Sequence, residues 1–131
     1  MSGLTDEQIH ELKSTLRAER TQLLEAIHAE LLRSDEESYT ELAGRVYDIG
    51  DQSAADLLAD LDLAAVDREL NELRDVEGAL ARFAQGGYGR CEDCGADIGY
   101  ERLRAYPTAR RCLSDQRRRE QQYVHPQTPT L

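Results

Sequence analysis

The sequence predicts an all-α fold, in which a long antiparallel coiled-coil hairpin precedes a small globular module with three cysteines and a C-terminal helix. Two observations carry this prediction. Apolar residues recur at three- and four-residue steps along two long stretches, and only 5% of the 131 residues are aromatic, with no Trp, so a large core is not expected. Two helices with one apolar stripe each would cover each other's stripe.

The first long helix is expected from Thr5 to about Arg33. Thr5 and Gln8 have the spacing of a capping box, in which each side chain satisfies an exposed backbone N–H at the helix start. The apolar stripe consists of Ile9, Leu12, Leu16, Leu23, Ile27 and Leu31.

A reversal is expected in the middle of the chain. The stretch 34–37 (Ser-Asp-Glu-Glu) resembles a second capping box and begins a short helix that runs through about Gly44. Residues 45–53 carry turn-forming residues and no sustained period, so they predict the tip of the hairpin. Ser53 or Asp51 would cap the helix that follows.

The second long helix is expected from about Ala54 to Gln85, where Gly86 and Gly87 end it. Its stripe consists of Leu63, Val66, Leu70, Leu73 and Leu80, widened by Leu58, Leu61 and Phe83. A shorter helix follows from about Ala109 or Cys112 to Tyr123. The expected domains are therefore 1–86 (N-terminal helices and hairpin, tip near 45–53), 87–123 (cysteine module and C-terminal helix) and 124–131 (a disordered tail).

The charge of the chain is strongly negative and uneven. The formal net charge is −10; residues 90–131 hold eight Arg and six acidic residues, a net of +2, so residues 1–89 carry −12. An acidic body argues against wrapping nucleic acid and favours a protein partner with a basic face, although acidity also serves solubility. No apolar run reaches the length of a membrane span and the N-terminus lacks the features of a signal peptide, so a soluble cytoplasmic protein is expected.

The cysteines have the spacing of a structural metal site. Cys91 and Cys94 form a C-x2-C pair, and seventeen residues separate Cys94 from Cys112. A second pair at the same spacing would complete a four-thiolate zinc site, but Asp115 occupies the fourth position. The pattern predicts a zinc-finger-like globular module.

Three interpretations of this module remain open. In the first, zinc is held by Cys91, Cys94, Cys112 and Asp115, since carboxylate oxygen is an accepted zinc ligand. In the second, the site is metal-free and Asp115 pairs with backbone N–H groups or with Arg110 or Arg111. In the third, His125 supplies the fourth zinc ligand. A redox role for the Cys91–Cys94 pair is a further alternative, although the chain lacks the βαβ context typical of that motif.

Residues 88–116, YGRCEDCGADIGYERLRAYPTARRCLSDQ, resemble the zinc-finger signature of the DksA/TraR family of bacterial transcription factors, roughly YGxCxxCGxxIxxxRLxAxPxAxxCxxCQ. Nearly every fixed position matches except the last cysteine. The resemblance covers about residues 5–122 and implies a regulator, not an enzyme, that binds RNA polymerase as a monomer without reading DNA. It also implies that the coiled-coil tip enters the secondary channel of the polymerase, as in the similarly shaped Gre factors, and modulates initiation.

The resemblance also assigns the tip. The family's D-x-x-D-x-A motif falls on Asp48 to Ser53, with Asp48 and Asp51 matching and Ser53 replacing the alanine. Turn and N-cap chemistry alone would also favour these residues. Of the basic positions that bind guanosine tetraphosphate in some members, Arg68 matches, whereas the others fall on Asp75, Tyr106 and Gln116. We therefore expect a weak or absent response to this alarmone.

Parts of the sequence would also suit three other functions. The run Arg117-Arg118-Arg119 would suit a zinc module that binds nucleic acid, although arginines near a helix C-terminus also complement its dipole. Asp48 and Asp51 would suit a Gre-like transcript-cleavage stimulator acting on a polymerase-bound metal. A structural coiled coil that only dimerises is the third alternative.

Overall fold

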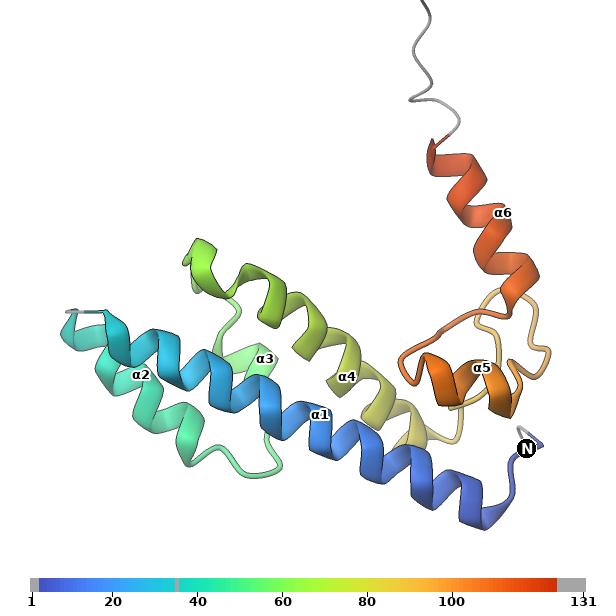
Figure 1. The fold of residues 1–131 in the computed structure, drawn as a ribbon, viewed down its shortest axis with the longest axis horizontal. Helices are drawn as coiled ribbons and strands as arrows, with labels where there is room; N and C mark the ends of the chain where they lie inside the picture. The colour runs from blue at the N-terminus through green and yellow to red at the C-terminus, as the bar shows by residue number, and fades with distance from the viewer. Residues whose placement is uncertain (1–2, 35, 125–131) are drawn as a thin grey trace, which may run out of the picture.

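The computed structural model describes residues 3–34 and 36–124 (Figure 1). In chain order the elements are α1 (Asp6–Arg33), α2 (Glu37–Tyr47), α3 (Ala54–Leu57), the 3₁₀ turn η1 (Ala64–Val66), α4 (Asp67–Gln85), α5 (Tyr100–Ala105) and α6 (Leu113–Val124). Over these residues no strand forms beyond an isolated bridge between Arg90 and Asp97, so the all-α prediction is confirmed. None of the described helices is long and apolar enough to span a membrane.

The predicted start of the first long helix and the predicted end of the second both form as expected. The Thr5 hydroxyl accepts a hydrogen bond from the Gln8 backbone N–H at 3.1 Å, and the Gln8 side chain accepts one from the Thr5 N–H at 3.0 Å. At the other end of the pair, Gly86 takes a left-handed conformation with φ 83° and terminates α4. Both helix boundaries are therefore encoded locally.

The predicted continuous helix from Ala54 to Gln85 is wrong in its first third. α3 ends at Leu57, and helical structure resumes only at Ala64. Asp60 and Asp62, both exposed, lie in the interruption, and Asp is a poor residue for a helix interior. The interruption allows Leu58 to turn inward, where it is fully buried.

α2 folds back along α1 instead of extending the hairpin (Figure 1). The C-terminal end of α1 therefore lies far from the cysteine module, and residues 48–53 lie beside the middle of α1. The second capping box does not form as expected: α2 begins at Glu37 after Glu36, with no side-chain cap, and the Ser34 hydroxyl accepts from the Glu36 N–H at 3.2 Å.

The described residues bury two apolar clusters, and α1 contributes to both. The proximal core joins the start of α1 and the end of α4 to the cysteine module: Leu12, Leu16, Val76, Ala79, Tyr88, Cys91, Ile98, Leu103 and Ala109. The distal core joins the second half of α1 and the start of α4 to α2, α3 and η1: Ile27, Leu31, Ala43, Val46, Ala54, Leu58, Val66, Leu70 and Leu73. Hydrophobic burial thus occurs at both ends of the α1–α4 pair.

The cysteine module packs at the end of α4 and the start of α1, and α6 projects away from the body (Figure 1). The sequence did not predict α5, whose Leu103 is fully buried in the proximal core. α6 begins at Leu113 and extends to Val124, one residue into the expected tail. Residues 125–131, including His125, lie outside the described part of the chain.

Candidate metal centre and the turn between α2 and α3

The first half of the metal site is a tight backbone loop. The N–H of Cys91 donates to the carbonyl of Ala96 at 2.8 Å, and the N–H of Gly95 donates to the carbonyl of Cys91 at 2.9 Å. Gly95 has φ 76°, a conformation that favours glycine. The loop directs the Cys91 and Cys94 thiols toward one point.

The second half of the site begins α6. The carbonyl of Cys112 accepts a hydrogen bond from the N–H of Gln116 at 2.9 Å, so Cys112 and Asp115 lie one helical turn apart. The N–H of Glu92 donates to the carbonyl of Arg110 at 2.9 Å and ties this half to the first.

The four predicted ligands come together. One ligand atom from each of Cys91, Cys94, Cys112 and Asp115 lies within 4.8 Å of all the others. The Sγ of Cys91 lies 3.1 Å from Oδ2 of Asp115, and the Sγ atoms of Cys94 and Cys112 are 3.9 Å apart. A tetrahedral zinc with bonds of about 2.3 Å to sulfur separates its sulfur ligands by about 3.8 Å. The donor set therefore fits a zinc ion.

The electrostatics of the site are those of a carboxylate among thiols. Hydrogen bonds from Cys94 and then Cys91 lower the pKa of Asp115, whereas the hydrogen bond to Asp115 raises the pKa of Cys94 to about 12. Burial opposes ionisation of Cys91, but N–H groups led by that of Cys112 outweigh it and lower the pKa of Cys91. Metal binding would release the thiol protons, because the thiolate is the ligand.

Arginines surround the site. Arg111, whose side chain is only 15% exposed, pairs through Nε with Oδ2 of Asp93 at 3.0 Å and through Nη2 with Glu92. The guanidinium near Asp115 is that of Arg118, at 3.4 Å from Oδ1, and not that of Arg110 or Arg111 as one interpretation expected. Arg111 therefore fastens the second half of the site to the first.

Aromatic residues seat the module on the helices. Tyr88 is buried, stacks on Phe83 with ring centroids 3.8 Å apart, and donates its hydroxyl to the carbonyl of Pro107 at 2.8 Å. Burial raises the pKa of Tyr88 to about 12. Tyr100 donates its hydroxyl to Glu11 of α1. The module is thus joined to both long helices.

The turn between α2 and α3 carries the other predicted site residues. Asp48 is the residue after α2, and Asp51 lies three residues before Ala54, where α3 begins; both are exposed. Ser53 is the N-cap of α3, as predicted, and its hydroxyl accepts from the Asp56 N–H at 3.1 Å. The structure thus places all three in one short connection.

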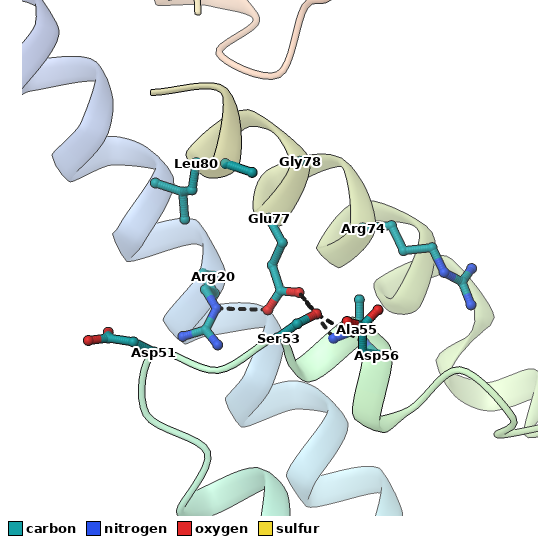
Figure 2. A pocket seen from close by; sticks show the side chains of 10 residues that line it. Arg20, Asp51, Ser53, Ala55, Asp56, Arg74, Glu77, Gly78 and Leu80 are labelled. Atoms are coloured by element: carbon teal, nitrogen blue, oxygen red, sulfur yellow. Dashed lines mark hydrogen bonds and ion pairs between the residues drawn. The ribbon is translucent and has the colours of Figure 1, made fainter. Parts of the chain in front are cut away.

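Glu77 of α4 anchors the end of this turn, and sequence reasoning missed it (Figure 2). Its carboxylate accepts from the Ser53 hydroxyl at 2.9 Å, the Ala54 N–H at 3.0 Å, the Ala55 N–H at 3.1 Å and Nε of Arg20 at 2.9 Å. Burial opposes ionisation of Glu77, but these four hydrogen bonds outweigh it and lower its pKa. The sequence signal for this role was its position, since the period of Leu70, Leu73 and Leu80 places residue 77 in the apolar stripe, where a charged residue is unexpected.

Arg20 of α1 anchors the middle of the turn. Besides the bond to Glu77, its guanidinium donates to the carbonyl of Gly50 at 3.0 Å and to that of Gln52 at 2.8 Å. The Arg20 and Glu77 side chains are 17% and 14% exposed. We call these six hydrogen bonds the Arg20–Glu77 network. Together they hold residues 50–55 against both long helices.

The residues at the expected alarmone positions do not form a basic pocket. Arg68 is 87% exposed and pairs with Glu72 at 3.3 Å, and Asp75 lies 3.8 Å from Arg110. Asp75 and Tyr106 line a groove that also contains Glu19 and Glu72. Among the described residues, Glu19, Glu72 and Asp75 line this groove together with no basic residue, so its lining is acidic. Burial, and then the charge of Glu72, raises the pKa of Glu19.

Comparison with known proteins gives a consistent set of relatives. A family model described as the prokaryotic dksA/traR C4-type zinc finger matches residues 86–121. The RNA polymerase-binding transcription factor DksA of Caulobacter vibrioides is 30% identical over 119 residues, which cover 89% of this chain and 79% of that protein. DksA of Salmonella typhimurium is 30% identical over 110 residues, which cover 84% and 70%.

A solved structure is also similar. The structure of transcription factor DksA2 from Pseudomonas aeruginosa aligns with a TM-score of 0.62 and 26% sequence identity, over 95% of this chain and 92% of that chain. The matched family model is of the four-cysteine type, so Asp115 is a departure of this chain from that type.

Proposed function

The chain belongs to the DksA/TraR family, and from that premise we propose that it binds bacterial RNA polymerase and modulates the initiation of transcription. The observation that carries the proposal is the 30% identity with an RNA polymerase-binding transcription factor over most of both chains. The acidic body supports it, because a protein partner with a basic channel attracts such a surface and nucleic acid does not. Such a protein acts in the cytoplasm.

In this proposal the turn of residues 48–53 is the element that enters the secondary channel of the polymerase. The exposure of Asp48 and Asp51 supports it, since two carboxylates in a short turn can contact basic side chains near the catalytic centre. The polymerase supplies the chemistry, and the chain acts as a monomeric regulator rather than an enzyme.

The cysteine module has a structural role in this proposal. Cys91, Cys94, Cys112 and Asp115 would hold zinc, which supplies a cross-link between the start of α6 and the loop after α4. Arg111 already joins the same two segments by ion pairs, so the chain's own residues pre-order the ligands. The module then fixes the base of the helical pair for docking.

Binding to bacterial RNA polymerase and the lifetime of promoter open complexes test the proposal. We expect wild type to bind and change the lifetime, and Asp51→Asn to bind with similar affinity but lose most of that change. Asp60→Asn is the matched control, because it removes one exposed carboxylate from the next connection. Absence of binding by wild type would overturn the proposal, and stimulated cleavage of backtracked RNA would replace it with Gre-like activity.

We further propose that the response to guanosine tetraphosphate is weak or absent. A tetraphosphate needs positive charge, whereas the groove beside Asp75 and Tyr106 is lined by Glu19 and Glu72. The alarmone is expected to change the effect on open complexes by less than about two-fold, since no basic side chain lines this groove among the residues that the structure describes. A large potentiation would contradict this.

The arginines of α6 support regulation through a protein partner more than through DNA. Arg118 pairs with Asp115, and Arg119 lies 3.9 Å from Asp93 of the cysteine module. These contacts use the charges to stabilise the module. A salt-dependent shift of duplex DNA by the purified chain would favour the nucleic-acid alternative.

A further inference from the structure

The turn of residues 48–53 is tied to the body of the molecule. All six hydrogen bonds of the Arg20–Glu77 network link residues 50–55 to α1 and α4 or join these two helices to each other. Its charged partners are mostly buried, at 17% and 14% exposure, where an ion pair is screened less than at the surface. Figure 2 shows Arg20 and Glu77 meeting over the start of α3.

The apolar residues next to this network have two possible sets of partners. In the structure Val46 of α2 and Leu58 after α3 pack in the distal core against Ile27, Leu31 and Leu70. In a straight hairpin, α2 would continue the line of α1, and Leu58 would lie on a helix continuous with α4. Val46 and Leu58 would then face each other across the same seam.

The sequence between α3 and α4 is compatible both with the observed break and with a continuous helix. Residues 58–63 contain neither Gly nor Pro, and the apolar period of α4 continues through Leu58, Leu61 and Leu63. Two exposed aspartates are the local residues that disfavour a helix there. A continuous helix over 54–85 needs residues 58–63 to become helical and the buried Ala54 and Leu58 to leave the distal core.

We propose that the Arg20–Glu77 network is an autoinhibitory contact, which holds the turn of residues 48–53 against α1 and α4. Its release lets residues 54–85 form one continuous helix that carries the turn away from the body. The extended pair would be longer by about 20 Å, since residues 54–66 add about thirteen helical residues at 1.5 Å each. The consequence for polymerase binding rests on the function proposed above, whereas the conformational change itself does not.

Glu77→Ala tests the proposal, because it removes four of the hydrogen bonds and alanine suits a helix. We expect amide exchange in residues 58–65 to slow by about ten-fold or more as they become helical. We also expect the maximum dimension in small-angle scattering to rise by about 20 Å. Arg20→Ala is expected to act in the same direction.

The matched control is Glu72→Ala, which removes a glutamate from the same helix and breaks an exposed ion pair with Arg68. It is expected to leave both measurements as in wild type. Faster exchange over residues 54–66 in Glu77→Ala, without the greater length, would mean that the network only stabilises the compact fold and would overturn the proposal. Indistinguishable behaviour of the two variants would overturn it as well.

A second variant is expected to form the continuous helix without any change to the Arg20–Glu77 network. Asp60→Ala combined with Asp62→Ala removes the two residues that interrupt the helix. We expect slower exchange in residues 58–65 and greater length here too. Failure of this double variant to extend, together with failure of Glu77→Ala, would exclude a continuous helix as an accessible state.

Polymerase binding separates the two proposals. If the network is autoinhibitory, Glu77→Ala and the double variant bind polymerase several-fold more tightly than wild type, because less of the protein is in the closed form. Extension of Glu77→Ala without binding by any variant would reject the proposed function and leave the conformational change standing. Binding by wild type that neither variant improves would overturn autoinhibition.

Discussion

In the cysteine module four ligand atoms lie within 4.8 Å of one another, whereas α2, α3 and residues 58–63, which we call the folded-back layer, are held by aliphatic packing and one charged network. Sulfur and carboxylate ligands satisfy a metal in one geometry. Leucine and valine side chains pack against any apolar partner of suitable shape. Donor chemistry thus specifies one arrangement of the ligands, whereas an apolar stripe specifies only which face of a helix is buried and leaves its partner open.

Metal removal is the strongest way to test the first half of this comparison. Loss of zinc to a chelator is expected to cost several kcal/mol and lower Tm by about 10 °C or more, because a structural zinc contributes directly to folding. Amide exchange is expected to rise in residues 86–112 and to stay unchanged in α2. Equal loosening of both regions would mean that they are not separate units.

Truncation of Leu58 tests the folded-back layer. Leu58 is fully buried, so Leu58→Ala is expected to destabilise the chain by about 2–5 kcal/mol in urea unfolding. The neighbouring Leu57 is only partly buried, and Leu57→Ala is expected to cost clearly less. Equal costs would show that this layer does not pack as described.

Replacement of Asp115 tests how much this ligand contributes to zinc affinity. Asp115→Cys is expected to tighten zinc binding by about ten-fold or more, because a thiolate replaces a carboxylate oxygen in the donor set. Competition with a chromophoric chelator measures this, with Asp115→Ala as the weakened counterpart. Unchanged affinity in both variants would remove Asp115 from the site.

Acidification tests the network that holds the folded-back layer, and its effect is the smallest. The pKa of Glu77 is lowered in the folded chain from a usual value of 4.5. Its contribution to stability is therefore full above about pH 5 and is lost as pH falls through the lowered value. The difference in unfolding midpoint between wild type and Glu77→Gln is expected to shrink below pH 4.5.

Other charged groups lie near Glu77. Arg20 of α1 pairs with Glu77, and Asp51, Asp56 and Arg74 line the same pocket (Figure 2). Glu72→Gln is the matched control, since Glu72 is half exposed on the same helix. A difference that stays constant down to pH 3 would contradict the role assigned to the Glu77 carboxylate.

The features that could be predicted from sequence have local causes or a distinctive donor chemistry. The Thr5–Gln8 capping box and the Gly86 helix end depend on residues within one or two helical turns of each other. The Ser53 cap belongs to the same class. The ligand set spans 24 positions from Cys91 to Asp115, but its metal-binding residue types in two pairs, each with three-residue spacing, identify it. These features need no knowledge of which helices meet.

The folded-back layer could not be predicted, because its contacts depend on which helices meet. Its hydrogen bonds join Arg20 to Gly50 and Gln52, and Glu77 to Ala54 and Ala55, over 22 to 32 positions. Its apolar residues follow the same helical period in the observed fold and in a straight hairpin. Asp60 and Asp62 were the one local signal for the break, and a continuing leucine stripe concealed it.

α1 contributes Leu12 and Leu16 to one core, Ile27 and Leu31 to the other, and Arg20 between them. This places a constraint on rotational phase. Inserting one residue between Leu16 and Ile27 turns one half of α1 by about 100° relative to the other, so both cores cannot keep their contacts. Inserting seven residues changes the phase by only about 20° but lengthens α1 by about 10 Å, and α4 also contributes to both cores, so α4 would need the same seven-residue insertion to keep them in contact. The distance between the two cores can therefore change only by whole heptads added to both helices together.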